Sequence, residues 1–125
     1  MNSTSTRPAP VRGYIAASNA FDSDALIGWF ADDAFVNDAR REFWGKDAIR
    51  AWLDREIIGD KVTMDPTATS GHYGEVIVHA VMDGEYDKTG LPDPFVLTYY
   101  FTVRDDRIVR LIIILNDPTP AWVQQ

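Results

Sequence analysis

The spacing of apolar residues changes once along this chain, near Gly59, and this change restricts the possible folds. Before Gly59 the apolar side chains recur every three or four residues, which indicates amphipathic helices; beyond it they alternate, which indicates strands. Helices followed by a run of strands predict an α+β domain, with helices packed on one face of a curved, mostly antiparallel sheet. A chain of 125 residues suits one domain. We expect that domain at 11–117, a disordered lead-in at 1–10 and a tail at 118–125.

The helical part of the pattern predicts three helices. Pro8 and Pro10 suit the start of the first helix, whose apolar or small positions are Tyr14, Ile15, Ala17, Ser18 and Phe21. The segment 22–24 is expected to end it and to cap a second, short helix with an apolar side formed by Ala25, Leu26, Trp29 and Phe30. Asp32 and Asp33 would end that helix and stay solvated.

A short strand is expected at 34–36 and a loop at 39–45. Asp47 can cap the third helix, which Gly59 ends. Its apolar face contains Ile49, Trp52, Leu53 and Ile57.

Strands are expected at 61–70, 75–84, 95–104 and 107–116, with 85–87 as a candidate partner of the second. The segment Arg104-Asp105-Asp106-Arg107 predicts a tight hairpin between the last two strands. Pro66 lacks a backbone donor, so the first of these strands is expected at an edge or with a bulge.

The last expected strand is apolar on both of its faces. Leu111, Ile113 and Leu115 point one way, while Ile112 and Ile114 point the other. The helices can cover only one face, and an exposed apolar face signals an interface. We therefore expect a homodimer formed through the outer face of the sheet.

Charge and composition exclude several classes of function. The formal net charge of −7 and the lack of a basic stripe argue against nucleic-acid binding. Without cysteine the chain has no disulfides, thiol chemistry or thiolate metal site, which fits a cytoplasmic protein. The longest aliphatic run, 111–115, is too short to span a membrane, and residues 1–10 do not form a signal peptide. No phosphate-binding loop, dinucleotide turn or nucleophile elbow occurs, so no cofactor is expected.

Three segments in order carry a resemblance to a known family: WFADDAFVND at 29–38, WGKDAIRAW at 44–52 and FTVRDDRIV at 101–109. They resemble the NTF2-like superfamily, and within it the ketosteroid isomerase and SnoaL-like group, over about 11–117. The resemblance implies a cone in which a strongly bent sheet wraps around a deep apolar pocket. It also implies dimers that pack through the outer face of the sheet.

The resemblance also implies site residues. Asp38 holds the place of the general base of the isomerases, and Tyr14 holds the place of the tyrosine that donates to the developing oxyanion. Tyr99 stands where the isomerases carry a protonated aspartate, and Phe30 and Leu53 replace the usual aromatic partners of the first tyrosine. The expected function is cofactor-independent proton transfer, of isomerase or cyclase type, on a small apolar carbonyl compound.

Strand alternation places Tyr99 on the expected pocket face. The other expected pocket residues are Phe30, Trp52, Val76, Val78, Ala80, Leu97, Phe101, Leu111, Ile113 and Leu115. Because most are aliphatic or aromatic, we expect an apolar ligand with one or two oxygens, as a carbonyl or a hydroxyl.

Each of these candidate residues can also have a purely structural role. Asp38 can cap a turn, while Tyr14 and Tyr99 can be ordinary core residues. His79 is expected on the outer face and His72 in a turn at the pocket rim, and two isolated histidines do not make a zinc site. Asn116 and Asp117 can reach the pocket mouth, as in SnoaL-like cyclases.

Two other functions remain open. One is a non-catalytic pocket for small-molecule binding or assembly. The other is a hydrolase or dehydratase that activates water, which in this fold wants an Asp–Arg–Asp set; it ranks last because no arginine is expected to face the pocket.

Overall fold

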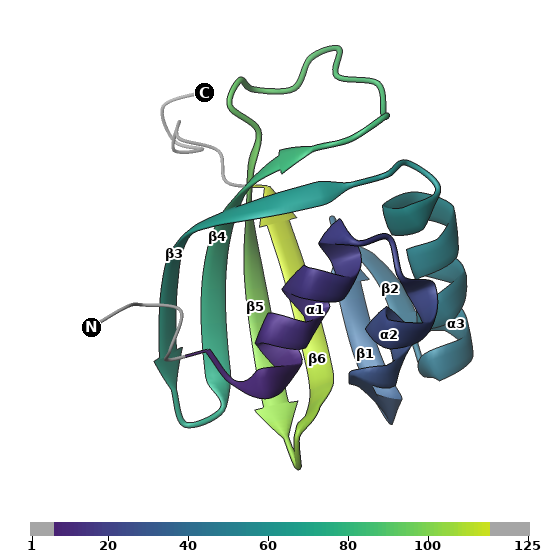
Figure 1. Cartoon of the computed structure of the whole chain (residues 1–125), viewed down its shortest axis with the longest axis vertical. Coiled ribbons are helices and arrows are strands. Elements are labelled where there is room, and N and C mark those ends of the chain that lie inside the picture. The colour runs from purple at the N-terminus through teal and green to yellow at the C-terminus, as the bar shows by residue number, and fades with distance from the viewer. Residues whose placement is uncertain (1–6, 116–125) are drawn as a thin grey trace.

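A computed structural model describes residues 7–115 of the chain. Within them, helices and strands follow one another in the order α1 (Ala9–Asn19), α2 (Ser23–Gly28), β1 (Phe30–Asp38), β2 (Arg41–Trp44), α3 (Lys46–Trp52), the π-helix η2 (Leu53–Ile58), β3 (Thr63–His72), β4 (Glu75–Asp83), β5 (Val96–Arg104) and β6 (Arg107–Leu115). Figure 1 shows α1 lying across one face of a bent sheet, with α2 and α3 beside β1 and β2.

The strands form one sheet with the order β2-β1-β6-β5-β4-β3. Every neighbouring pair is antiparallel except β1 and β6, which are parallel. The predicted α+β class with a curved, mostly antiparallel sheet is therefore confirmed. The parallel pairing matters for the site, because it sets Asp38 at the end of β1 beside Ile113 of β6.

The first two helices begin near the places that the sequence predicts. Pro8 precedes α1, which starts at Ala9 and so includes two residues of the expected disordered lead-in. The side chain of Asp22 accepts a hydrogen bond from the backbone N–H of Ala25 at 3.1 Å and caps α2. Residues 1–6 and 116–125, which include most of the expected lead-in and all of the expected tail, lie outside the described part.

The predicted end of the second helix was wrong. The helix ends at Gly28, and Phe30 is the first residue of β1. The N–H of Ile108 donates to the carbonyl of Trp29 at 2.8 Å, so sheet pairing outweighs the apolar helical spacing. Asp32 and Asp33 accordingly lie within β1, where both are exposed, as expected for solvated side chains.

The predicted loop at 39–45 was also wrong, since most of it is β2. Ala39 and Arg40 form a tight turn with positive φ angles of 53° and 72°, and the carboxamide oxygen of Asn37 accepts from the N–H of Arg40 at 3.0 Å. β2 is an edge strand, and edge strands tolerate charged residues. Because of these charged residues, the sequence pattern did not indicate a strand here. Asp47 does not cap the third helix: Gly45 occupies the N-cap position, with a φ of 84°.

The later strands follow the predicted alternation to within two residues at each end. Asp105 and Asp106 make the expected tight turn, with φ angles of 52° and 58°. Both expectations for Pro66 hold, because β3 lies at the sheet edge and its register shifts between Pro66 and Ala68. Residues 85–87 are not a strand and belong to the long connection between β4 and β5.

The core lies between the inner face of the sheet and the helices. Alternate residues of β4, namely Val76, Val78, Ala80 and Met82, are buried there. Tyr14 of α1 packs its ring against the rings of Phe101 at 5.4 Å, Tyr99 at 6.0 Å and Phe30 at 6.1 Å. These aromatic rings fill the interior between α1 and the middle of the sheet.

The outer face of the sheet carries the other alternate set. Ile112 and Ile114 of β6 lie there with Tyr100 of β5, and Ile114 is 48% exposed. Within residues 7–115, no helix has the length and apolar content needed to cross a membrane.

Candidate functional site

A cavity of about 340 Å³ opens between the end of η2, the ends of β1, β5 and β6, and the connection between β4 and β5. Its walls are mostly apolar, and the acidic residues Asp38, Glu56 and Asp60 also line it. The full lining consists of Asp38, Ala39, Glu56, Ile57, Asp60, Val62, Met82, Tyr86, Leu91, Phe95, Leu97, Tyr99, Ile113 and Leu115.

Some of the expected pocket residues line this cavity and others do not. Asp38, Leu97, Tyr99, Ile113 and Leu115 are in its wall. The others are buried and do not line this cavity, namely Phe30, Trp52, Val76, Val78, Ala80, Phe101 and Leu111. The physical reason is that the large rings around Tyr14 fill the part of the interior that strand alternation alone would leave hollow.

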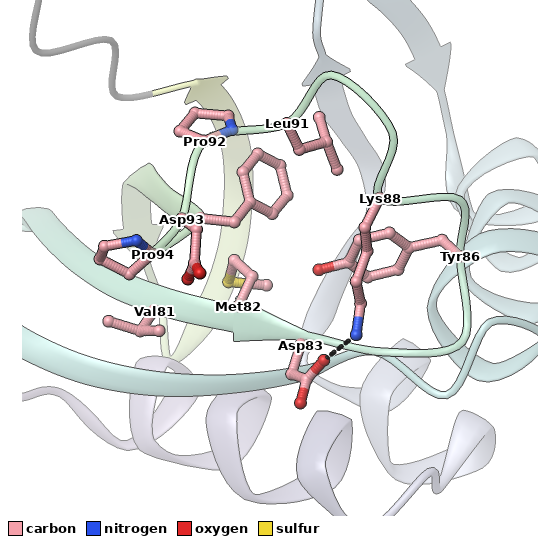
Figure 2. A pocket seen from close by; sticks show the side chains of 10 residues that line it. Val81, Met82, Asp83, Tyr86, Lys88, Leu91, Pro92, Asp93 and Pro94 are labelled. Atoms are coloured by element: carbon pink, nitrogen blue, oxygen red, sulfur yellow. Dashed lines mark hydrogen bonds and ion pairs between the residues drawn. The ribbon is translucent and has the colours of Figure 1, made fainter.

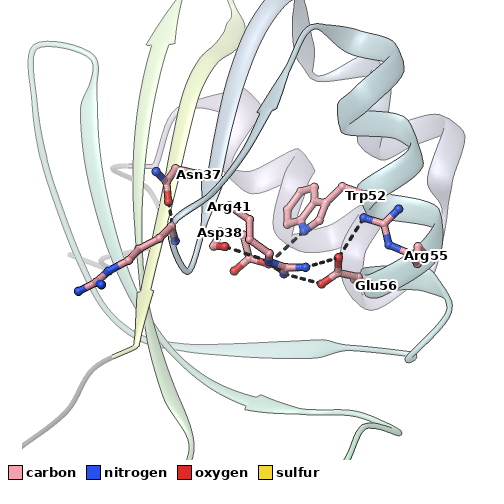
Figure 3. Close-up of polar contacts among 7 residues, drawn as sticks. Asn37, Asp38, Arg41, Trp52, Arg55 and Glu56 are labelled. Atoms are coloured by element: carbon pink, nitrogen blue, oxygen red, sulfur yellow. Dashed lines mark hydrogen bonds and ion pairs between the residues drawn. The ribbon is translucent and has the colours of Figure 1, made fainter.

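Asp38 is held by two donors at the edge of the cavity (Figure 3). The indole Nε1 of Trp52 donates to its Oδ2 at 3.0 Å, and Nη2 of Arg41 donates to the same oxygen at 2.9 Å. The Asp38 side chain is only 20% exposed. Asp38 is therefore an oriented, charge-paired carboxylate rather than a bare carboxylate in an apolar cleft.

Arg41 joins Asp38 to a second carboxylate in the cavity wall. Its Nη1 and Nη2 donate to the two carboxylate oxygens of Glu56 at 2.8 and 2.6 Å. This two-bond pairing, the main cause, raises the pKa of Arg41 and lowers that of Glu56, and a weaker contact from Arg55 at 3.1 Å acts in the same direction on Glu56.

The sequence prediction missed Arg41 and Glu56 as parts of the site. The signal for Arg41 was present in the segment Asp38-Ala-Arg-Arg41, because a two-residue turn places Asp38 directly opposite Arg41. Glu56 gave no such signal, since its contact depends on how α3, which packs against β2, positions the η2 that follows it.

Tyr14 is fully buried and its hydroxyl has no hydrogen-bond partner among residues 7–115. Burial, and then the nearby Tyr99 and Asp38, raise its pKa, so the phenol stays neutral and able to donate. An unpaired buried hydroxyl is costly, and strain, a bound water or ion, or a catalytic role can account for such a group. Tyr14 does not line the cavity itself; it lies behind Tyr99.

Tyr99 does line the cavity. Its hydroxyl donates only a weak hydrogen bond, to the sulfur of Met82 at 3.9 Å. Burial is the main cause that raises the pKa of Tyr99, with Asp38 a second cause. The structure thus brings Asp38 and Tyr99 to one cavity, with Tyr14 in contact with the ring of Tyr99.

The remaining candidates lie apart from this cavity. His79 is on the outer face, with Nδ1 3.0 Å from the hydroxyl of Thr98, and His72 is exposed at the end of β3. Asn116 and Asp117 lie outside the described residues. Over 7–115, no group of three acidic, histidine or cysteine side chains is placed to hold a metal ion.

Comparisons with known proteins point to one family. The sequence profile of the SnoaL-like domain matches residues 11–111. A Sinorhizobium meliloti protein provisionally named a polyketide cyclase is 31% identical, with 91% of this chain and 100% of that chain covered and a TM-score of 0.79. No curated protein matches.

Two further solved structures share the fold. A protein from Sphaerobacter thermophilus is 24% identical, with 88% of this chain and 97% of that chain covered and a TM-score of 0.73. A Catenulispora acidiphila protein with a ketosteroid isomerase-like fold, solved in complex with trimethylamine, is 22% identical, with 89% and 88% covered and a TM-score of 0.74.

Proposed function

This chain belongs to the SnoaL-like domain family, and we propose that it is a cofactor-independent enzyme that removes a proton from a small apolar carbonyl compound. One observation carries the proposal: a carboxylate, Asp38, and a phenol, Tyr99, line the same largely apolar cavity. The first would accept the proton, and the second would donate to the carbonyl oxygen as negative charge builds on it.

Asp38 suits the role of base in two respects. A carboxylate is one of the side-chain groups that act as general bases in proton transfer. Its Oδ2 is fixed by Trp52 and Arg41, which leaves Oδ1 as the oxygen to meet a substrate. Fixing the carboxylate before the reaction removes the cost of orienting it during the reaction.

Tyr99 and Tyr14 suit the role of donors because both phenols are buried and stay neutral. The Tyr99 hydroxyl has only a thioether partner, and a carbonyl oxygen or an enolate is a much better acceptor than sulfur. The Tyr14 hydroxyl has no partner among the described residues, but because Tyr14 does not line the cavity, it would donate only to an oxygen that passes beyond the ring of Tyr99. In other enzymes each such donor contributes about 10²–10³ in rate.

The oxyanion part of the proposal can be tested with para-nitrophenol, whose phenolate absorbs visible light and mimics an enolate. We expect the wild type to bind it with an increased phenolate fraction, and Tyr99→Phe and Tyr14→Phe to reduce that fraction. Tyr100→Phe is the matched control, because Tyr100 is the next residue of β5 but lies on the outer face. An equal phenolate fraction in all four proteins would contradict the donor roles.

Activation of water is a second candidate function, and a specific contact favours it. Arg41 lies between Asp38 and Glu56, and both carboxylates line the cavity. A carboxylate–guanidinium–carboxylate set can orient a water molecule and remove its proton. Hydrolysis or dehydration would then consume or release water, which distinguishes either reaction from isomerisation by the mass of the product.

We also propose that the protein is a homodimer through the outer face of the sheet. Tyr100, Ile112 and Ile114 line a shallow groove there with Glu75, Thr102 and Arg110. Apolar side chains on an open sheet face favour a partner that covers them, and a second copy presents the same groove.

A further inference from the structure

A second and larger cavity lies under the connection between β4 and β5. It measures about 570 Å³ and lies between residues 84–95 and the end of β4 (Figure 2). Its lining consists of Val81, Met82, Asp83, Tyr86, Lys88, Leu91, Pro92, Asp93, Pro94 and Phe95. We call it the outer cavity, and the cavity that contains Asp38 the inner cavity.

The two cavities share one wall. Met82, Tyr86, Leu91 and Phe95 line both of them. The rings of Tyr86 and Phe95 meet edge to face at 6.0 Å, and the N–H of Met82 donates to the carbonyl of Phe95 at 2.8 Å. Tyr86, Leu91 and Phe95 are only partly buried, so small rotations of these side chains could join the two spaces without unfolding a strand.

The outer cavity has a different chemistry from the inner one. Its charged groups are Asp83, Lys88 and Asp93, and the ammonium of Lys88 pairs with Asp83 at 2.6 Å while lying 5.7 Å from the centre of the Tyr86 ring. The lining contains two carboxylates and one ammonium, so it carries a net negative charge. Such a lining favours a ligand group that is cationic or donates hydrogen bonds.

The size of the inner cavity gives a second reason to consider both spaces together. Ligand sites usually measure about 300–1,000 Å³, so 340 Å³ alone would hold only a small molecule. A ligand whose alkyl chain passes between Tyr86 and Phe95 would extend from the inner cavity, beside Tyr99, to Asp93 in the outer cavity.

We propose that the outer cavity is a second compartment of the binding site, and that the ligand is an elongated apolar molecule with a terminal amine. Its carbonyl end would lie beside Asp38 and Tyr99, and its amine end beside Asp83 and Asp93. The position of the carbonyl rests on the proposed function. The existence of the compartment does not.

The first test uses the wild-type protein and three probes: methyl butyl ketone, methyl nonyl ketone, and methyl nonyl ketone with an amine at the end of its alkyl chain. Backbone amide shifts in NMR spectra report where each probe lies. We expect the short ketone to shift inner-cavity residues such as Asp38 and Tyr99 but not Lys88 or Asp93, and both long probes to shift Lys88 and Asp93 as well. If the long probes shift only the inner residues, the two-compartment site is refuted.

The second test removes one charge from the outer cavity. Asp93→Asn should weaken binding of the amino ketone about fivefold, the upper range for a solvent-exposed charge pair, and leave both plain ketones unchanged. Glu85→Gln is the matched control, since it removes one negative charge from the same connection without lining either cavity. Equal weakening by the two variants, or none by Asp93→Asn, would overturn the amine assignment.

These tests separate the inference from the proposed function. The NMR shifts and the binding affinities are measured without turnover. They therefore test the outer cavity even if the Asp38→Asn variant shows that no proton transfer occurs. Conversely, an active enzyme whose long probes stay in the inner cavity would keep the proposed function and lose the outer compartment.

Discussion

The indole Nε1 of Trp52 donates a hydrogen bond to Oδ2 of Asp38 across 3.0 Å. Trp52 is fully buried on α3 and stacks on Phe43 of β2, with ring centroids 5.8 Å apart. A rigid core residue therefore fixes the orientation of the proposed base.

Trp52→Phe should test this relationship, since it removes the donor and keeps an aromatic ring against Phe43. A hydrogen bond to a charged group contributes about 1.5–3 kcal/mol. We expect the free energy of unfolding in urea to fall by about that amount, and turnover to fall with little change in ligand affinity. Trp44→Phe, on an exposed indole of β2, is the control. A loss of turnover no larger than that of the control would argue against a positioning role.

Tyr14→Phe should separate function from stability. The variant removes a buried hydroxyl that has no partner among the described residues, so the protein should unfold at the same free energy or up to about 1 kcal/mol higher. Turnover should fall about 10²-fold or more if this hydroxyl donates to the oxyanion. Chemical denaturation and steady-state rates check the two parts. Marked destabilisation with unchanged turnover would identify Tyr14 as a core residue only.

The ion pair between Arg41 and Glu56 predicts a specific dependence of stability on pH. Because the pKa of Glu56 is lowered in the folded state, the unfolded chain binds more protons between the folded value and the ordinary value near about 4.3. This contribution to stability is therefore fully present above about pH 5 and is lost as the pH falls through the folded pKa.

Arg41→Gln should reduce the difference in unfolding free energy between about pH 6 and about pH 3, relative to the wild type. Arg55→Gln is the matched control, because Arg55 makes a single contact of 3.1 Å with Glu56 and should reduce the difference less. Denaturant titrations at the two pH values provide the measurement. If both variants kept the wild-type difference in unfolding free energy between the two pH values, the Arg41–Glu56 ion pair would not contribute to stability.

The proposed dimer predicts that a charge on the outer face separates the subunits. Ile114→Asp should convert a dimer into a monomer in sedimentation velocity, because it places a carboxylate in an apolar contact. Tyr73→Asp serves as the control, since Tyr73 is 93% exposed in the turn between β3 and β4. A wild-type protein that sediments as a monomer would contradict the proposal directly.

Most of the fold could be predicted from the sequence, because alternation and turn chemistry act locally. The tight turn at Asp105 and Asp106 and the edge position of the strand with Pro66 both followed from single residues. The strand expected at 34–36 is part of β1, but the start of β1 at Phe30 could not be predicted, because long-range pairing with β6 decides it. The edge strand β2 was missed because it is short and mostly exposed. The N–H of Ile108, far along the chain, fixes the carbonyl of Trp29.

The site was less predictable than the fold. Resemblance pointed to Asp38 and Tyr99, which do line one cavity, but alternation could not distinguish a cavity wall from a closed core. Phe101 and Val78 have the right parity and are buried against other side chains instead. The contact between Arg41 and Glu56 depends on the packing of α3 against β2, which positions η2 and which no local pattern encodes.

The most direct test of the central claim is hydrogen–deuterium exchange next to the carbonyl of small alkyl and cyclic ketones in D2O, followed by proton NMR. With Asp38 as the base, the wild type should accelerate exchange in at least one ketone above the buffer rate. Asp38→Asn should return the rate to that of buffer, while Asp33→Asn, an exposed change in the same strand, should keep the wild-type rate. Equal exchange rates in buffer, wild type and Asp38→Asn across the series would contradict the account.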